Sequence, residues 1–225
     1  MQINSEFNSS FANVDGVGIV IGRPNSQQNQ QHIGVLFIDA DLEPKFLHLA
    51  WHYDLRKDNP CPKYLWLDIP LDPINKIHLA TVCALIFKSN QDGIPYGICI
   101  EGTGFAEDGS FTAEEQLSGL TCATFVIQVF HSQKLWIIDF EKWGFRGDDK
   151  LWQNNILDSL QNKAPADYIN NQRQKIQKGA ARFRPEEVAA AATLPNQPHG
   201  LDTLIEQSSE ILKAVISHAE KIAAL

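Results

Sequence analysis

The sequence predicts an α+β protein, with a mixed core in residues 1–145 and a helical C-terminal extension in residues 146–225. Two observations support this division. Short apolar runs bounded by turn residues fill the first part of the chain and are typical of strands. Beyond Leu151 the apolar residues instead recur at the three- and four-residue spacing of helices. The 225 residues, 44% of them hydrophobic, suffice for one core with an appended subdomain.

Six apolar runs predict the strands of the core. The first is VGIVIGR (17–23), which the polar loop PNSQQNQQ separates from IGVLFIDAD (33–41). A tight turn at 42–44 leads into KFLHLAWHYDL (45–55), and KYLWLDIPL (63–71) follows a proline-rich turn. The last two runs are YGICIEG (96–102) and KLWIIDFEKW (134–143). We expect each run to form one strand.

Helical spacing predicts the remaining elements. INKIHLATVCALIFKS (74–89) places Ile77, Val82, Leu85 and Ile86 on one side of a helix. Two further helices are expected over 148–163 and 166–183, then a flexible segment near 185–200. A long amphipathic helix begins at Leu201, and we expect it to dock on the protein's own core. A homodimer or protein-partner contact through residues 201–225 is the alternative.

Composition narrows the function classes. The net charge of −8 and the pI near 5.3 argue against nonspecific nucleic-acid binding, which requires a basic surface. No run of 18 apolar residues predicts a membrane span, and the first residues lack the pattern of a secretory signal. The four cysteines are widely and irregularly spaced, which favours neither zinc nor a disulfide framework. We therefore expect a reduced, cytoplasmic protein that binds no metal or cofactor.

Cys122 is the cysteine with a distinctive setting. It begins the apolar face of a predicted helix in SGLTCATFVIQVF, which Ser118 or Thr121 could cap. A helix N-terminus stabilises a thiolate, so this position suits a nucleophile. The alternative is a buried structural thiol, because free cysteine is among the most buried residue types. The other three cysteines lie in a turn or in apolar runs and are expected to be structural.

Two histidines in FLHLAWHYDL could supply a base. His48 and His52 share one face of the predicted strand with Ala50, and the opposite face is an unbroken apolar row. The alternative to a catalytic role is that these histidines lie on a solvated strand face, which is common in antiparallel sheets. A zinc helix is disfavoured because the glutamate of that motif is absent and the spacing is that of a strand.

These two segments resemble the motifs of a known enzyme family. LTCATFVIQVF is similar to the cysteine helix of papain-like NlpC-type peptidases, and HLAWHYDL resembles their catalytic-histidine strand. The histidine precedes the cysteine, which is the order of the circularly permuted members, including lecithin retinol acyltransferase-like enzymes. The resemblance covers about residues 30–140 and implies an antiparallel sheet packed against the cysteine-bearing helix.

The resemblance implies a site and an activity. Cys122 would be the nucleophile and His48 the base, and Asp68 on the next strand would orient the imidazole, with Asp54 and His52 as rivals. The implied activity is thiol-dependent cleavage of an amide, peptide or isopeptide bond. The alternatives are an acyltransferase or thioesterase with the same site, and a non-enzymatic interaction protein. The Cys122 amide would hold the oxyanion with a second donor, for which Gln116 is the candidate.

Overall fold

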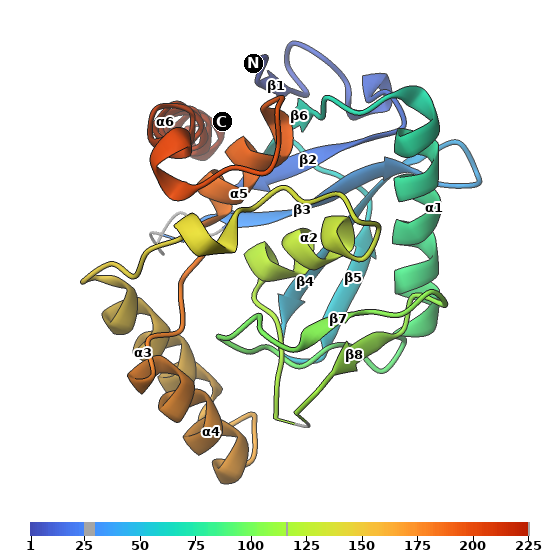
Figure 1. Cartoon of the computed structure of the whole chain (residues 1–225). Coiled ribbons are helices and arrows are strands. Elements are labelled where there is room, and N and C mark those ends of the chain that lie inside the picture. Colours follow the sequence, from blue (N-terminus) through green and yellow to red (C-terminus); the bar gives the residue numbers. More distant parts are fainter. Residues whose placement is uncertain (25–29, 116, 225) are drawn as a thin grey trace.

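The computed structural model describes residues 1–24, 30–115 and 117–224. It is an α+β structure, as the sequence predicts, and its main sheet has six antiparallel strands in the order β1-β6-β2-β3-β4-β5 (Figure 1). The strands are β1 (Asn4–Ser5), β2 (Val17–Gly22), β3 (His32–Ile38), β4 (Pro44–Trp51), β5 (Asp54–Asp58) and β6 (Tyr64–Asp68). A separate hairpin joins β7 (Thr103–Phe105) and β8 (Phe111–Ala113).

The described α-helices are α1 (Pro73–Ser89), α2 (Cys122–His131), α3 (Asp149–Leu160), α4 (Ala166–Gln177), α5 (Pro185–Thr193) and α6 (Ile205–Ala223). Three short 3-10 helices are η1 (Phe11–Asn13), η2 (Phe140–Lys142) and η3 (Leu201–Leu204). None of the helices in the described ranges is both long and apolar enough to cross a membrane.

The two faces of the sheet have separate hydrophobic clusters because side chains alternate along each strand. One face carries Ile33, Val35, Leu47 and Leu49 and packs against α2. The opposite face carries Leu36 and Phe46 among others and is covered by the N-terminal segment. A hydrogen bond of 3.0 Å from Trp66 Nε1 to the Ser9 carbonyl fixes this segment.

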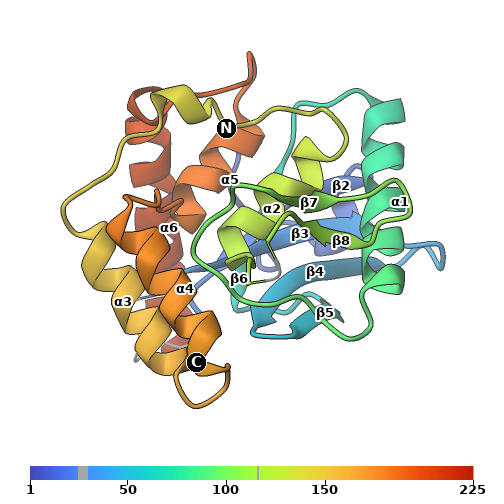
Figure 2. The ribbon, with the colours of Figure 1, turned by 60° about the horizontal axis from the view of Figure 1, so that its bottom comes forward.

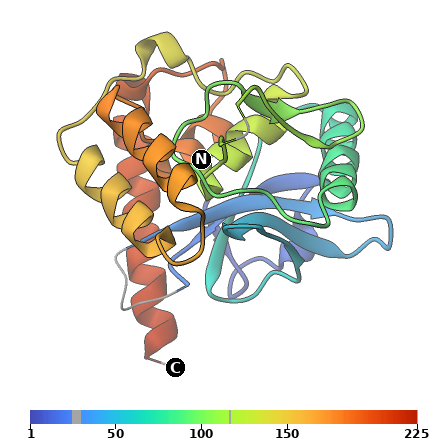
Figure 3. The ribbon, with the colours of Figure 1, turned by 90° about the horizontal axis from the view of Figure 1, so that it is seen from below.

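Helix α2 lies between the sheet and the β7–β8 hairpin (Figure 3). All of its residues are buried, including the predicted face of Cys122, Phe125, Val126, Val129 and Phe130. Burial on every side explains why the helix is mainly apolar, with Thr124, Gln128 and His131 as its buried polar residues.

Three predicted strands are wrong in detail. The run 45–55 is a hairpin, because the chain turns after Trp51 with Tyr53 in the left-handed region (φ 55°). The runs 96–102 and 134–143 form single bridges, Tyr96 to Leu120 and Ile138 to His199. Most of their apolar side chains are buried as a strand pattern implies, although Trp136 and Phe140 are exposed. Their backbone groups bind loops and side chains instead of a neighbouring strand.

The C-terminal extension packs closely on the core. Residues 185–193, inside the segment expected to be flexible, form α5, all of whose residues are buried. Helix α5 contacts β2, β3 and α2, and α6 packs on α5, β2 and β6 as the predicted docking requires. Figure 2 shows α3 and α4 side by side next to this assembly.

Candidate functional site

Local hydrogen bonds fix the start of α2. Thr121 is the N-cap, and its hydroxyl accepts a hydrogen bond of 3.1 Å from the Thr124 amide. The Thr124 hydroxyl accepts one of 2.7 Å from the Thr121 amide, which completes a reciprocal cap. Of the two caps considered from the sequence, Thr121 is therefore confirmed. The cap sets Cys122 as the first residue of the helix.

Burial dominates the chemistry of the Cys122 thiol. The residue is 4% exposed, and burial raises its pKa to about 11. Hydrogen bonding from the Ile33 backbone amide and from Tyr96 opposes the rise without cancelling it. The thiol is therefore neutral at pH 7, and a nucleophilic role requires a base at the moment of attack.

The contact with Ile33 locates the thiol at the end of a strand. The pairing between β3 and β4 runs from Ile38 back to Val35, and Ile33 lies beyond its end. Cys122 thus meets the backbone of β3 near the start of the strand. His32 is the preceding residue, and its side chain points to the opposite face of β3 because side chains alternate along a strand.

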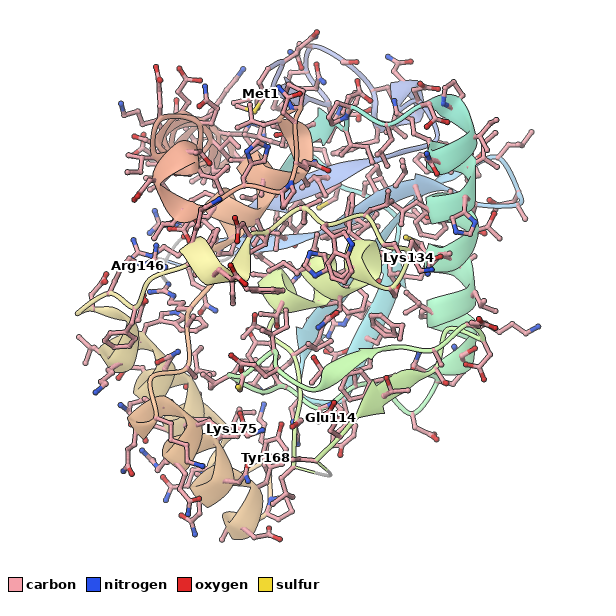
Figure 4. All side chains as sticks on the ribbon, in the orientation of Figure 1. Met1, Glu114, Lys134, Arg146, Tyr168 and Lys175 are labelled. Atoms are coloured by element: carbon pink, nitrogen blue, oxygen red, sulfur yellow. The ribbon has the colours of Figure 1, made fainter. Side chains whose placement is uncertain are left out.

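Helix α4 contacts the Tyr96 backbone through Tyr168, which Figure 4 labels. The Tyr168 hydroxyl donates a hydrogen bond of 2.8 Å to the Tyr96 carbonyl, and the Tyr96 amide donates one of 3.0 Å to His52 Nδ1. A Cβ at Gly119 would lie 2.3 Å from the Pro95 carbonyl oxygen, so only glycine allows this close approach. The extension therefore helps to build the site.

His48 belongs to a chain of three side chains from neighbouring strands. Its Nδ1 lies 2.7 Å from Nε2 of His32 on β3, and its Nε2 lies 3.1 Å from Oδ2 of Asp58 on β5. The His48 ring also stacks on Phe46, with centroids 4.1 Å apart and planes within 10°. Packing and two hydrogen bonds thus fix the ring of His48.

The hydrogen bonds that join His32, His48 and Asp58 determine which ring nitrogen of each histidine carries the proton. Burial lowers the pKa of His32 to about 3, with a further contribution from His48, and burial also lowers the pKa of His48. Both rings are neutral at pH 7. Asp58 accepts from His48 Nε2–H, so His48 Nδ1 accepts from His32 Nε2–H. His32 Nδ1 is then the unprotonated nitrogen, and the lowered pKa of the ring makes it a weak base in this state.

The structure does not assemble the site predicted from the sequence. Within the described residues the hydrogen-bond partners of His48 are His32 and Asp58, and its ring stacks on Phe46 on the sheet face opposite to α2, so it does not pair with Cys122. Asp68 is exposed and pairs with Gly18 at one end of β6. The histidines lie near the other end of β6, where Tyr64 pairs with Gly22 and Gly22 pairs with His32. His52 falls in the turn after β4 and binds the Tyr96 amide instead of sharing the face of His48. Asp54 forms an ion pair with Arg56. Gln116 lies outside the described residues.

Sequence reasoning missed His32 and Asp58. The available signal was the hairpin itself: His32 opens β3 and His48 lies on the paired strand, so antiparallel pairing brings two rings together. Asp58 was missed because the run 45–55 was expected to be one straight strand, and its turn at Tyr53 carries Asp58 back beside His48.

A cavity of about 290 Å³ opens beside the histidines. Its wall includes His32, His48, Trp51, Arg56, Tyr64 and Tyr96. Tyr96 also contacts the thiol, so it connects Cys122 with the cavity. The indole nitrogen of Trp51 is buried and makes no hydrogen bond within the described residues, which leaves it as a donor for a bound molecule.

Gly34 leaves room for the histidine pair. A Cβ at this position would lie 2.4 Å from the Leu47 carbonyl oxygen and 2.7 Å from the His48 Cβ. We expect Gly34→Ala to destabilise the protein by about 2 kcal/mol, because overpacking forces backbone shifts. Gly104→Ala is the matched control, since its Cβ would have 3.7 Å to its nearest neighbour. Urea unfolding of both variants measures the difference, and equal stabilities would contradict the packing argument.

The described residues contain no cluster of three or more histidine, cysteine, aspartate or glutamate side chains that could hold a metal ion. Comparison with protein-family models, curated protein sequences and solved structures finds no match for this chain. The functional argument therefore rests on the geometry of the site.

Proposed function

We propose that the protein is a thiol-dependent hydrolase that cleaves an amide, peptide or isopeptide bond, with Cys122 as the nucleophile and His32 as the base. One observation supports the proposal: Tyr96, which hydrogen-bonds the Cys122 thiol, lines the same cavity as His32 and His48 of the Asp58–His48–His32 chain. Because side chains alternate along a strand, His32 points to the other face of β3 from Ile33, so the proposed proton transfer runs around the end of the strand through this cavity. This assignment moves the base from His48, where the family resemblance put it, to His32. His48 then becomes the residue that orients the base, and Asp58 takes the place of Asp68.

The proposed reaction begins from a neutral thiol and a neutral imidazole. His32 Nδ1 takes the thiol proton while the sulfur attacks the carbonyl carbon, and the carbonyl electrons move to the oxygen. His48 donates no proton to the substrate; with Asp58 it stabilises the imidazolium that forms on His32. Collapse of the oxyanion expels the amine, which takes the proton from His32. Water then hydrolyses the thioester with His32 again as the base.

The oxyanion would lie at the N-terminus of α2. The Cys122 amide, which donates to the Tyr96 hydroxyl oxygen, is one proposed donor, and the Tyr96 hydroxyl, which donates to the Cys122 sulfur, is the second; both would turn to the oxyanion when it forms. Histidine strands that precede the cysteine helix would make the site a circularly permuted papain-like one. A buried structural thiol is the competing interpretation, because Cys122 is almost fully buried.

An acyl-enzyme experiment tests the proposal. The wild-type protein should hydrolyse p-nitrophenyl acetate, a small activated ester, and acid quenching should trap one acetyl group on Cys122, located by peptide mass spectrometry. Cys122→Ala should reduce turnover at least about 1,000-fold, because the covalent route is lost.

Cys61→Ala is the matched control, since Cys61 is half-buried and lies in a turn. It should keep both the turnover and the adduct. Acetylation of Cys61 or Cys99 with Cys122 unmodified would reject the proposed nucleophile and support the structural interpretation.

A further inference from the structure

A second cavity lies at the other end of α2 from Cys122. It has a volume of about 670 Å³, within the usual range for small-molecule sites. Its wall combines the C-terminal part of α2, strand β7, the 134–143 segment with η2, and the link between α4 and α5, which lie close together in Figure 1. Since α2 rises about 1.5 Å per residue, Cys122 and His131 are about 13 Å apart along it. The cavity is therefore separate from the proposed catalytic site.

Aromatic side chains dominate the wall. Trp143 and Phe183 are buried and stack with their ring centroids 4.8 Å apart, and Phe140 meets Phe183 edge to face at 5.7 Å. Trp136 and Phe140 remain 53% and 42% exposed. Large exposed rings next to a buried aromatic floor are unusual on a surface without a ligand or partner, and they favour a flat ring as the occupant.

Two polar side chains from one face of α2 line the same cavity. His131 is 7% exposed, and its buried Nε2 makes no hydrogen bond within the described residues. Burial lowers its pKa to about 4, so the ring is neutral at pH 7. Gln128, one helical turn earlier, is 9% exposed and donates through Nε2 to the Thr103 carbonyl at 2.9 Å. Its Oε1 is then the atom that can accept a further hydrogen bond.

An unpaired buried imidazole costs free energy unless a ligand pairs with it. His131 can donate from Nε2 and Gln128 can accept at Oε1, which matches the carbonyl and the N–H of an amide. Among the described residues that line the cavity, Glu101 is the one with a charged side chain, and its negative charge disfavours anionic ligands. We propose that this cavity binds a neutral, flat aromatic molecule that carries a carboxamide or an equivalent donor–acceptor edge.

Calorimetric titration of the full-length protein tests the site with naphthalene-2-carboxamide as the probe. We expect saturable binding with a Kd below about 1 mM. The matched anion, naphthalene-2-carboxylate, should bind at least about tenfold more weakly, because Glu101 repels it and Gln128 Oε1 receives no donor. Binding is measured without turnover, so the outcome is independent of the proposed hydrolase.

Substitutions test whether the probe binds in this cavity. Trp136→Ala should weaken binding about tenfold through the loss of ring contact. Phe145→Ala is the matched control: Phe145 is 43% exposed, similar to Phe140, but does not line the cavity, and its removal should leave Kd unchanged. His131→Phe keeps a ring but loses the donor to the carbonyl oxygen, so it should weaken binding of the carboxamide about tenfold. Absence of saturation at 10 mM probe, or equal binding by the Trp136 and Phe145 variants, would overturn the site.

Discussion

Replacement of His32 by glutamine should reduce turnover of p-nitrophenyl acetate at least about 1,000-fold, equivalent to about 4 kcal/mol of barrier. Glutamine can still donate a hydrogen bond to His48 Nδ1, but it cannot take the thiol proton. Because burial keeps the pKa of Cys122 near 11, the thiolate is scarce at pH 7 without a base. The loss should therefore appear in kcat rather than in KM.

Further variants compare how much each residue of the Asp58–His48–His32 hydrogen-bond chain contributes to turnover. His78→Gln alters an exposed histidine on α1 that binds Gln133 and should change nothing. Asp58→Asn should cost about 10- to 100-fold, because it weakens the alignment of His48 while leaving the base intact. If His48→Gln matched the loss of Cys122→Ala while His32→Gln kept full activity, His48 would be the base, as the family resemblance implied.

Removal of α6 by truncation after Gly200 should unfold or aggregate the protein. The deleted segment contains Leu204, Ile211 and Val215, which are 0%, 0% and 1% exposed. At about 1.5–3 kcal/mol for each buried aliphatic side chain, their gross contribution is about 5–9 kcal/mol, comparable with the stability of a whole domain. The truncation would also expose α5. Size-exclusion chromatography and thermal melting measure the result.

A pair of point variants separates docking from other causes. Val215→Asp places a charge in the buried contact and should lower the melting temperature strongly, whereas Ile205→Asp changes a residue that is 63% exposed and should have little effect. The prediction would be wrong if the truncated chain stayed folded with an unchanged melting temperature. A change confined to its oligomeric state would then support the alternative role of residues 201–225 in a homodimer.

The sequence by itself determined the local elements. Apolar spacing predicted the positions of β2, β3, β6, α1, α2 and α6. The face predicted for α1 was wrong at Ile77, which is 66% exposed, whereas Val82 and Ile86 are buried as expected. The cap at Thr121 and the position of Cys122 at the start of α2 were also predictable, since capping depends on residues within one helical turn. For the same reason, the tight turn at 42–44 could be recognised.

Only the tertiary structure decided the hydrogen-bonded histidine chain. His32, His48 and Asp58 come from three strands, and their contact depends on the register of those strands and on the turn at Tyr53. The alternation of 96–102 was real, yet its backbone pairs with Leu120 and with side chains of α4 rather than with a strand. Such partners are distant in the chain and leave no local pattern, whereas periodicity reports only which side of a segment is buried.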